Sequence, residues 1–274
     1  MAEARAALRG RVAVVTGGNV GIGRATSRAL AFAGASVVVT GRNEATVSET
    51  VEELADLTGR GDHLGRCFDV RDGQGGAEMA ARVLERFGRI DILVAAAGVL
   101  RPRGGSLKTL RQMSVAEWDE VVDTNLTGTF LTTRAVLPAM IRQRKGDIVH
   151  VSSTSGRRGL AYDAAYCASK FGVIGLTESL AEEVRQYGIR VQVLLPGAID
   201  TPMWEQNGPI PKPREALPPE RVADAIITLL TLPEDTMLQS PVIQPFSGPT
   251  RPEWLAAHRG AHAIARAATP STRP

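Results

Sequence analysis

The sequence predicts an α/β protein built around a doubly wound parallel sheet, and three observations point to this fold. Short apolar runs, the first over residues 12–15, alternate along the chain with longer segments of helical periodicity. These runs are apolar throughout, as expected for strands that are buried on both faces. A length of 274 residues with 43% hydrophobic residues suits one large α/β domain or two small ones.

Composition and charge exclude several classes of protein. The formal net charge is only +3, which does not indicate a nucleic-acid partner. No apolar run is long enough to span a bilayer, and the first ten residues lack the apolar core of a signal peptide. Cys67 and Cys167 have no metal-ligand spacing, so we expect no metal site and a reducing compartment. The sequence therefore predicts a soluble, cytoplasmic protein without a membrane partner.

The first strand, expected over 11–16, leads into a glycine-rich turn and a helix over 24–33. Glycines in such a turn let the backbone approach a pyrophosphate, and a helix N-terminus favours its negative charge. The glycines are Gly17, Gly21 and Gly23, so the common G-x-G-x-x-G spacing is not met. Strand, turn and helix together still predict a dinucleotide site.

A second strand, over 36–40, ends at Gly41 and Arg42. Dinucleotide folds that select NAD place Asp or Glu about 20 residues after the glycine turn, where it bonds the ribose 2′-hydroxyl. Here no carboxylate would repel a 2′-phosphate, and a guanidinium that can pair with one is present. We therefore predict NADP(H) as the cofactor. Two alternatives stay open: Arg42 is a solvated residue at the start of the next helix, over 43–58, or Glu44 binds the ribose and NAD(H) is used.

The third strand, over 63–68, ends at Asp69. Asp69 is a candidate for contact with an adenine ring or, equally, a cap for the helix that follows Asp72. A fourth strand, over 90–95, leads into the small-residue segment 96–98, where the backbone can pass close to the cofactor. The alternation of strands and helices up to this point supports the doubly wound sheet.

A long helical stretch is predicted over 115–144, although Asn125 lies in its interior. A polar residue there is expected to be buried and hydrogen-bonded, or to bend the helix. The following strand, over 148–151, ends at Ser152 and Ser153. Hydroxyl groups at the carboxyl end of a parallel strand lie where such sheets bind their ligands.

The segment 164–176 predicts a helix that carries Tyr166 and Lys170 one turn apart. Positions i and i+4 share a helix face, so we expect the phenol and the ammonium group side by side. A free phenol has a pKa of about 10, too high for efficient proton transfer at neutral pH. A neighbouring cation favours the phenolate, so we predict that Lys170 lowers the pKa of Tyr166.

The C-terminal part completes the sheet with a strand over 189–195 that meets Pro196 and Gly197, a proline-rich loop over 201–219, a helix over 220–231 and a last strand near 240–246. A loop of this length is a candidate substrate lid. The tail from Thr250 is rich in Ala and Arg, and we expect it to be partly disordered or to lie at an interface.

Taken together, these motifs resemble the short-chain dehydrogenase/reductase family, in its smaller single-domain branch. The resemblance covers about residues 9–245 and rests on Thr16-Gly17-x-x-x-Gly21-Ile22-Gly23, Asn125 in Asn-Leu-Thr-Gly, Ser153 thirteen residues before Tyr166, Tyr166-x-x-x-Lys170, and Pro196-Gly197 followed by Thr201-Pro202-Met203. It implies a Rossmann fold with seven parallel strands in the order 3-2-1-4-5-6-7. The catalytic domain would span 1–249 and the tail 250–274.

The resemblance also implies roles for four residues in carbonyl reduction. Tyr166 would be the general acid, and the base in the reverse reaction. Lys170 would lower the pKa of Tyr166 and hold the nicotinamide ribose. Ser153 would hydrogen-bond the substrate oxygen, and Asn125 would hold a water that links Lys170 to solvent. The residues expected to bind the cofactor are Gly17, Asn19, Gly21, Ile22, Gly23, Arg42, Asp69, Val70, Ala96, Gly98, Tyr166, Lys170, Pro196, Gly197, Ile199 and Thr201.

Three features depart from the family pattern. The family usually has Asn-Asn-Ala-Gly after the fourth strand, where this chain has Ala-Ala-Ala-Gly over 95–98. We therefore expect weaker support of the cofactor site and of the central sheet. Leu195 stands where Asn often precedes the Pro-Gly pair, and the last strand lacks the frequent Asp-Gly-Gly ending. The altered ending leaves the geometry of a tetramer open.

The leading hypothesis is an NADP(H)-dependent oxidoreductase, of EC class 1.1.1, that acts on a carbonyl or alcohol group of a small molecule. Alternatives are a dinucleotide-binding sensor or scaffold without catalysis, and a non-redox epimerase or dehydratase on the same fold. Cations near the presumed mouth favour an acidic substrate or a carrier-bound acyl group, whereas solvated loop charges are the simpler interpretation. These cations are Arg101, Arg103, Arg157, Arg158, Lys212 and Arg214. The apolar walls of the pocket are expected to be Tyr162, Met203 and Trp204.

A homodimer or homotetramer is a further expectation from the resemblance. Family members usually pair through the helices that correspond to about 115–144 and 163–187. The sequence gives weaker support of its own, because apolar residues such as Val173, Leu176 and Leu180 occupy more than one face of the second helix.

Overall fold

The computed structural model describes residues 7–102, 107–208 and 210–246. The chain divides into two compact units, Met1–Gln244 and Pro245–Pro274. The first unit contains the whole sheet and all of the predicted site residues. The predicted tail over 250–274 lies outside the described residues.

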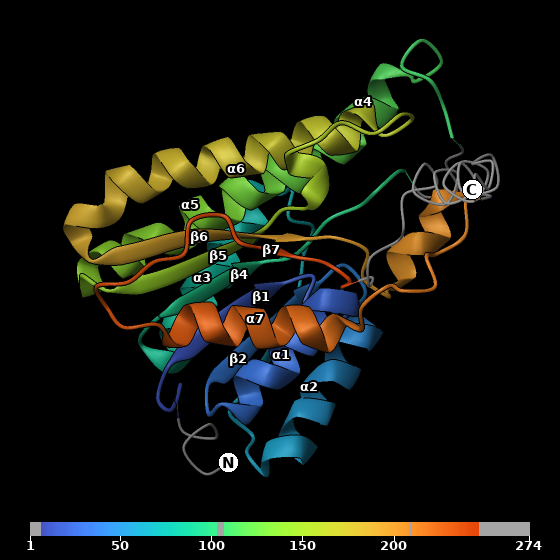
Figure 1. The fold of residues 1–274 in the computed structure, drawn as a ribbon. Helices are drawn as coiled ribbons and strands as arrows, with labels where there is room; N and C mark the ends of the chain where they lie inside the picture. Colours follow the sequence, from blue (N-terminus) through green and yellow to red (C-terminus); the bar gives the residue numbers. More distant parts are fainter. Residues whose placement is uncertain (1–6, 103–106, 209, 247–274) are drawn as a thin grey trace, which may run out of the picture. The chain divides into compact units, whose positions relative to one another are not determined.

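Strands and helices alternate along the first unit, as predicted (Figure 1). The elements are β1 (Val12–Thr16), α1 (Gly21–Phe32), β2 (Ser36–Gly41), α2 (Glu44–Thr58), β3 (Leu64–Cys67), α3 (Gly73–Phe87), β4 (Ile92–Ala95), α4 (Val115–Val122), α5 (Gly128–Gln143), β5 (Gly146–Val151), α6 (Ala164–Val184), β6 (Ile189–Pro196), α7 (Pro219–Thr231) and β7 (Val242–Ile243).

The seven strands form one parallel sheet in the order β3-β2-β1-β4-β5-β6-β7. This confirms the predicted Rossmann order. The order reverses between β1 and β4, where Val15 pairs with Val39 of β2 on one side and with Val94 of β4 on the other. Ligands of doubly wound sheets bind outside the carboxyl ends of the strands at such a reversal.

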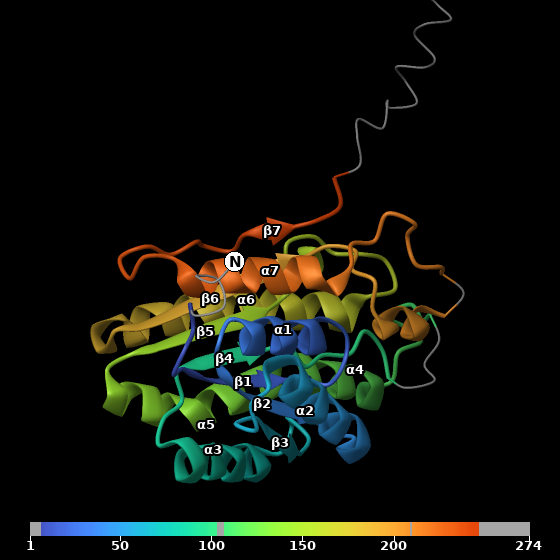
Figure 2. The same cartoon turned by 90° about the horizontal axis from the view of Figure 1, so that it is seen from below.

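Apolar side chains cover both faces of the sheet, which explains why its central strands β1 and β4 are almost entirely apolar. Ala13 and Val15 of β1 face the core under α1, α2 and α7. Val12 and Val14 face the opposite core, under α3, α5 and α6. Helices α1 and α7 run side by side over the first face, as both ribbon views show (Figures 1 and 2). The sheet is therefore a rigid base for the loops at its carboxyl edge.

The predicted helix over 115–144 is not continuous. A π-helical turn, Asp123–Thr127, separates α4 from α5. Asn125 lies in this turn and is fully buried. Both expectations for this polar residue are met, since its side chain is hydrogen-bonded and the regular helix is interrupted.

Other differences concern the ends of elements. Helix α1 begins at Gly21, three residues before the predicted start, so the last part of the glycine turn is already helical. The last strand is only Val242–Ile243 instead of 240–246. The predicted loop over 201–219 contains a 3-10 helix, Pro202–Asn207. Among the described residues, no helix is long and apolar enough to cross a membrane.

Candidate active site

The glycine turn connects β1 and α1 at the carboxyl edge of the sheet. Gly17 and Gly21 have φ angles of 64° and 51°, a left-handed conformation that glycine adopts without steric cost. A Cβ atom at Gly23 would lie 2.0 Å from the carbonyl oxygen of Gly17. Val20, the N-cap residue of α1, makes no side-chain cap hydrogen bond. The first N–H groups of α1 therefore lack a side-chain cap, and the turn fits the pyrophosphate of a dinucleotide.

The segment after β6 lies against this turn. A Cβ atom at Gly21 would meet the methyl group of Thr201 at 3.1 Å. Earlier in the segment, Pro196 ends β6, and Gly197 donates its N–H to β7 over 2.7 Å. Ile199, which lies between Gly197 and Thr201 in the sequence, is buried. Thr201 thus brings the predicted segment 196–201 next to the glycine turn.

Asn19 extends from the turn to the end of β2. Its Nδ2 atom donates to Thr46 Oγ1, in the first turn of α2, over 2.6 Å. A Cβ atom at Gly41 would lie 2.4 Å from Asn19 Oδ1, so a larger residue there requires Asn19 to move. Arg42 follows with a side chain that is 59% exposed, and its Nη1 lies 3.9 Å from Asp69 Oδ2. Asn19, Arg42 and Asp69 therefore gather beside the carboxyl ends of β2 and β3.

Asp69 does not cap α3, so this alternative is wrong. The cap is Asp72, whose carboxylate accepts an N–H from the first turn over 2.9 Å. Asp69 instead accepts both guanidinium branches of Arg71, at 2.7 and 3.0 Å. This side-chain hydrogen bonding is the main cause that lowers the pKa of Asp69. The carboxylate is therefore charged and already paired beside Arg42.

Thr16 holds the segment in which alanines replace the family's asparagines. Its Oγ1 atom accepts the N–H groups of Ala96 and Ala97 at 3.1 and 3.2 Å. Ala95 keeps its place in the sheet, paired with Thr16 of β1 and with His150 of β5. The Thr16 hydroxyl group thus anchors this backbone, and the weaker support expected without the asparagines stays a prediction.

The side chain of Asn125 connects three parts of the site. Its Oδ1 atom accepts the N–H of Val99 at 2.8 Å, and its Nδ2 atom donates to the Val99 carbonyl at 2.9 Å and to Ser169 Oγ at 3.0 Å. A Cβ atom at Gly98 would lie 3.2 Å from Asn125 Oδ1 and 3.6 Å from Lys170 Nζ. The space left by this glycine therefore borders both predicted residues.

Ser153, Tyr166 and Lys170 meet at the carboxyl end of β5. The Ser153 side chain lies close enough to the Tyr166 hydroxyl group to lower the pKa of the phenol. Lys170 is buried, its Nζ atom donates to the Val151 carbonyl over 2.9 Å, and it lies 5.7 Å from the centre of the Tyr166 ring. Ser152 Oγ donates to the Lys170 carbonyl over 2.8 Å, which fixes α6 against β5. The structure therefore brings together the four residues predicted for catalysis.

Burial dominates the pKa values of this cluster. It raises the pKa of Tyr166 to about 12, the hydrogen bond with Ser153 lowers it, and Asp163 and Cys167 raise it further. Burial also lowers the pKa of Lys170 to about 8. The pKa of Tyr166 is therefore raised in this structure and not lowered as predicted, because the cost of burying the phenolate exceeds the stabilisation that the charge of Lys170 offers it.

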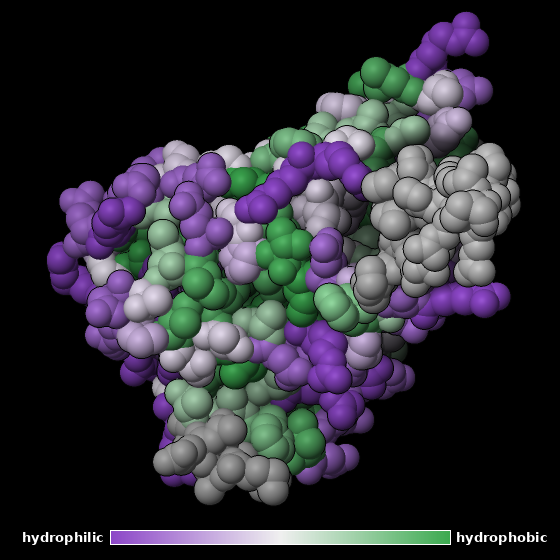
Figure 3. Space-filling model, viewed as in Figure 1, coloured by the Kyte–Doolittle hydropathy of each residue, from purple (hydrophilic) through white to green (hydrophobic). Residues whose placement is uncertain are grey.

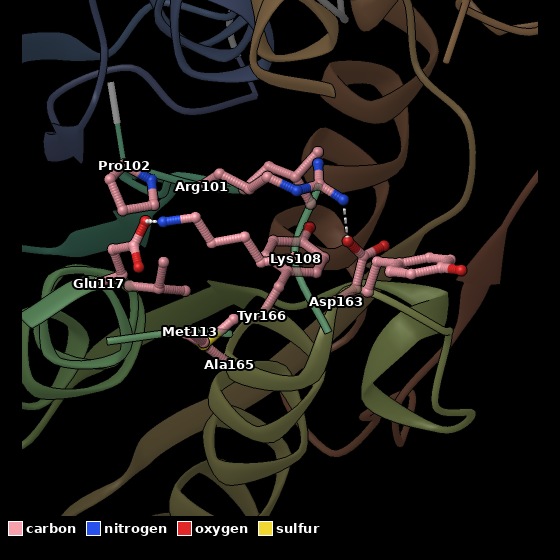
Figure 4. A pocket seen from close by; sticks show the side chains of 11 residues that line it. Arg101, Pro102, Lys108, Met113, Glu117, Asp163, Ala165 and Tyr166 are labelled. Carbon is pink, nitrogen blue, oxygen red and sulfur yellow. Dashed lines mark hydrogen bonds and ion pairs between the residues drawn. The ribbon is translucent and has the colours of Figure 1, made fainter. Parts of the chain in front are cut away.

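A pocket lies beside Tyr166, between the segment after β4, helix α4 and the start of α6 (Figure 4). Its apolar lining consists of Leu100, Pro102, Met113, Val121 and Ala165. The charged side chains of the lining are paired, Arg101 with Asp163, and Lys108 Nζ with Glu117 at 2.6 Å (Figure 4). Among the described residues, the pocket therefore presents no unpaired charge.

The predicted pocket walls and mouth cations are corrected in part. Tyr162 lines the pocket, whereas Met203 and Trp204 do not. The six predicted cations do not form one cluster: Arg101 and Lys212 are in ion pairs, Arg157 donates to the Ser240 carbonyl, Arg158 and Arg214 are exposed, and Arg103 lies outside the described residues. The hypothesis of an acidic substrate therefore loses most of its support.

Thr16 and Asp163 have no role predicted from the sequence, although Thr16 begins the glycine motif and Asp163 stands three residues before Tyr166.

Ile22 and Val70 are both predicted to bind the cofactor. Ile22 packs against the core under α1, and Val70 is buried where a Cβ atom at the first residue of α5 would meet it at 2.6 Å. Both support their loops, and their contact with the cofactor stays a prediction.

The fold and the glycine turn define a dinucleotide-binding α/β protein. A family model of the short chain dehydrogenases matches residues 11–210. A putative ketoacyl reductase of the monensin polyketide synthase from Streptomyces virginiae is 42% identical over 201 residues, which are 72% of this chain and 73% of the relative.

Two solved structures are similar as well. A metagenomic short-chain oxidoreductase in complex with NADP has a TM-score of 0.75 and 34% identity, and the match covers 88% of this chain and 100% of that one. A 3-oxoacyl-[acyl-carrier protein] reductase from Brucella melitensis with bound NAD has a TM-score of 0.76 and 32% identity, with 89% and 92% covered.

This chain belongs to the short-chain dehydrogenase family, whose members are oxidoreductases that bind a nicotinamide dinucleotide. The resemblance inferred from the motifs is thereby confirmed.

Proposed function

We propose that the protein is an NADP(H)-dependent oxidoreductase that reduces a carbonyl group of a small molecule, or oxidises the corresponding alcohol, with Tyr166 as general acid or base. The observation that carries this proposal is the cluster of Ser153, Tyr166 and Lys170, which lies beside a pocket and at the same edge of the sheet as the glycine turn.

In this proposal each residue of the cluster has its own role in the reaction. When bound, the nicotinamide group supplies the hydride, and negative charge develops on the substrate oxygen. The hydroxyl groups of Ser153 and Tyr166 stabilise this charge, and Tyr166 donates its proton to the oxygen. A pKa of about 12 keeps the phenol protonated at neutral pH, and Lys170 favours the phenolate that forms. Asn125 would hold a water that links Lys170 to solvent.

The preference for NADP(H) rests on the end of β2. The Asn19 side chain occupies the space into which a carboxylate-bearing residue at position 41 would extend. Asp69, the nearest carboxylate to Arg42 at 3.9 Å, is paired with Arg71. The exposed Arg42 guanidinium is therefore the group that a ribose 2′-phosphate would meet.

The substrate in this proposal is a neutral ketone. The pocket beside Tyr166 is lined by apolar side chains and by ion pairs that are already closed. A free carboxylate would find no unpaired cation among its described residues. The names of the related ketoacyl and 3-oxoacyl reductases point to the same chemistry, because the reacting end of a 3-oxoacyl thioester is an uncharged ketone.

The described residues give no specific support to the two alternatives, a dinucleotide-binding sensor without catalysis and a non-redox enzyme. The feature that argues for loss of catalysis is the pair Ala95 and Ala96, which stands where the family usually has two asparagines. Thr16 holds the backbone of this segment, and the nearness of Ser153 and Lys170 to Tyr166 supports catalysis by this phenol. Oxidoreduction is therefore the function that the geometry supports best.

We also propose that the protein forms a homodimer or homotetramer. Helices α5 and α6 expose Phe130 and Phe171, at 44% and 47%. Apolar side chains also gather around β7 and α7 (Figure 3), where Val242 is 42% exposed. Large exposed apolar groups favour burial against another chain. Sedimentation at micromolar concentration tests this, and a monomer would contradict it.

The free thiols of Cys67 and Cys167 support a reducing compartment, and we propose the cytoplasm. Fractionation of cells that express the tagged protein tests this, and recovery from an oxidising compartment would contradict it.

The central experiment measures NADPH oxidation with a panel of neutral ketones, a 3-oxoacyl thioester and carboxylated analogues at low salt. Wild-type protein should turn over neutral ketones best. Tyr166→Phe should abolish turnover while NADPH binding, followed by fluorescence, is retained. Full activity of Tyr166→Phe would remove the proposed role of this phenol. NADPH binding without turnover of any carbonyl compound would favour the sensor instead.

A further inference from the structure

Arg101 is a buried cation in the loop after β4, where the sequence alone suggests a solvated charge. Its residue exposure is only 6%. A guanidinium group is rarely buried without partners, because its transfer out of water is costly unless its charge and its donors are satisfied. The partners of Arg101 therefore indicate why it is held inside the protein.

These partners come from two segments far away in the sequence. Nη2 pairs with Asp163 Oδ1, and Nη1 donates to Asn207 Oδ1 at 2.7 Å and to the Gln206 carbonyl at 3.4 Å. Gln206 Oε1 in turn accepts the N–H of Leu100 at 2.8 Å and that of Arg101 at 3.3 Å. Asn207 itself is buried. One guanidinium group thus joins the 3-10 helix Pro202–Asn207 to the start of α6.

Asp163 is the N-cap residue of α6, three residues before Tyr166. Aspartate at this position normally accepts an N–H of its own helix, but here the side chain makes no cap hydrogen bond. The carboxylate is turned to Arg101 instead (Figure 4). The preceding residue, Tyr162, has φ of 68°, an unfavourable conformation for a residue with a side chain. The turn before α6 is therefore held by contacts from outside the helix.

We propose that Arg101 is a positioning residue that locks the segment 202–207 to the start of the helix that carries Tyr166. The branch on Asn207 holds this segment, whose Gln206 fixes the backbone of Leu100 and Arg101 in the pocket lining. The branch on Asp163 fixes the turn that orients Tyr166. The inference rests on the proposed function, since it takes Tyr166 as the proton donor.

The two branches predict two kinetic signatures. Asn207→Ala removes the hydrogen bond to the Asn207 side chain and should raise the KM of the ketone about five- to tenfold, the effect of one lost hydrogen bond, with kcat nearly unchanged. Asp163→Asn weakens the contact that fixes the turn before Tyr166, so it should lower kcat. Because it also removes a negative charge that raises the pKa of Tyr166, it should move the pH profile of alcohol oxidation to lower pH. Arg101→Met should show the KM and kcat effects together. The dissociation constant of NADPH should stay the same in all three variants.

The pH profile must be interpreted with every charged or titratable group that faces Tyr166. These groups are Asp163, Cys167 and Lys170 on or next to α6, Arg101 after β4, and Lys108 and Glu117 across the pocket. Only Asp163 is changed in the Asp163→Asn variant, so the shift of the profile reports on that carboxylate.

Hydrogen exchange provides a test that does not need activity. Amides of residues 202–208 should exchange faster in Arg101→Met and Asn207→Ala than in wild type, while Arg158→Met, which changes an exposed arginine, should match wild type. If Arg101→Met lowers only the melting temperature, and KM, kcat and exchange per folded molecule are unchanged, the lock does not exist. If wild type reduces no ketone, the proposed function fails, and the exchange comparison still decides whether Arg101 holds the segment.

Discussion

The ammonium group of Lys170 donates a 2.9 Å hydrogen bond to the main-chain carbonyl of Val151, at the carboxyl end of β5. Together with the bond from Ser152 Oγ to the Lys170 carbonyl, it ties α6 to the strand at the position where Tyr166 is needed. The bond also keeps the cation buried, and burial lowers its pKa to about 8. The charge that favours the Tyr166 phenolate is therefore itself sensitive to pH near neutrality.

Ketone reduction should accordingly be fastest below about pH 8 and should decline above it. Tyr166, with a pKa of about 12, stays protonated across this range, so the decline reports the loss of charge on Lys170. The measurement is kcat/KM for the ketone as a function of pH. Lys170→Met should reduce kcat by about 100-fold or more. In this variant kcat/KM for the ketone should no longer decline above about pH 8. A decline that persists in Lys170→Met would assign it to another group.

The choice of cofactor should depend on Arg42. Arg42→Ala removes the cation nearest to the expected 2′-phosphate and should raise the KM for NADPH about five- to tenfold. This increase is smaller than for a buried ion pair, because the Arg42 side chain is largely exposed to solvent. The KM for NADH should change little. Glu44→Gln is the matched control, because it would weaken NADH binding only if Glu44 held the ribose. A wild-type preference for NADH in kcat/KM would show that Arg42 is merely a solvated residue.

The features that the sequence predicts correctly are those set by neighbours along the chain. Apolar runs indicate the strands because both faces of the sheet are buried, and Gly17, Gly21 and Gly23 indicate the turn because their backbone requirements are local. The spacing of Tyr166 and Lys170 places both in one cluster through helix geometry alone.

The features that the sequence does not predict depend on distant partners. Arg101 is buried because Asp163 and Asn207, 62 and 106 residues away, reach its guanidinium group. The pKa of Tyr166 is set by how much protein surrounds the helix, which helical spacing does not reveal. The last strand is short because only Leu195 and Pro196 of β6 pair with it, a matter of tertiary contact.

The glycine turn should tolerate no side chain at Gly23. In Gly23→Ala the new Cβ atom would lie 2.0 Å from the Gly17 carbonyl oxygen, a backbone atom that can move only if the turn moves. We expect a loss of about 1–3 kcal/mol in stability and at least about tenfold weaker NADPH binding. Gly61→Ala is the control, since nothing lies within 4 Å of its added Cβ atom. Thermal unfolding and fluorescence titration measure both effects, and equal NADPH affinity in the two variants would contradict the prediction.

His150 should make the protein less stable in acid. It is fully buried in β5, with its ring nitrogens 3.0 Å from Thr133 Oγ1 and 2.9 Å from Thr177 Oγ1. A neutral ring has one N–H, so it donates to one of the two threonines, whose own hydroxyl protons go to the carbonyls of Thr129 and Val173. Burial first, and the charge of Lys170 second, lower its pKa from 6.5 to about 4.

Because the folded pKa of His150 lies below the unfolded value, the unfolded chain takes up the proton first as the pH falls. The contribution to stability is therefore complete above pH 6.5 and is lost between 6.5 and about 4, by roughly 3 kcal/mol in total. Urea unfolding at a series of pH values measures it. His150→Gln, whose amide keeps one donor and one acceptor, should remove most of this slope. His63, whose pKa burial also lowers, should leave the smaller remainder, so His63→Gln is the matched variant. If His63→Gln removes the dependence of stability on pH and His150→Gln does not, the acid-sensitive group is His63, just before β3, and not His150 in β5.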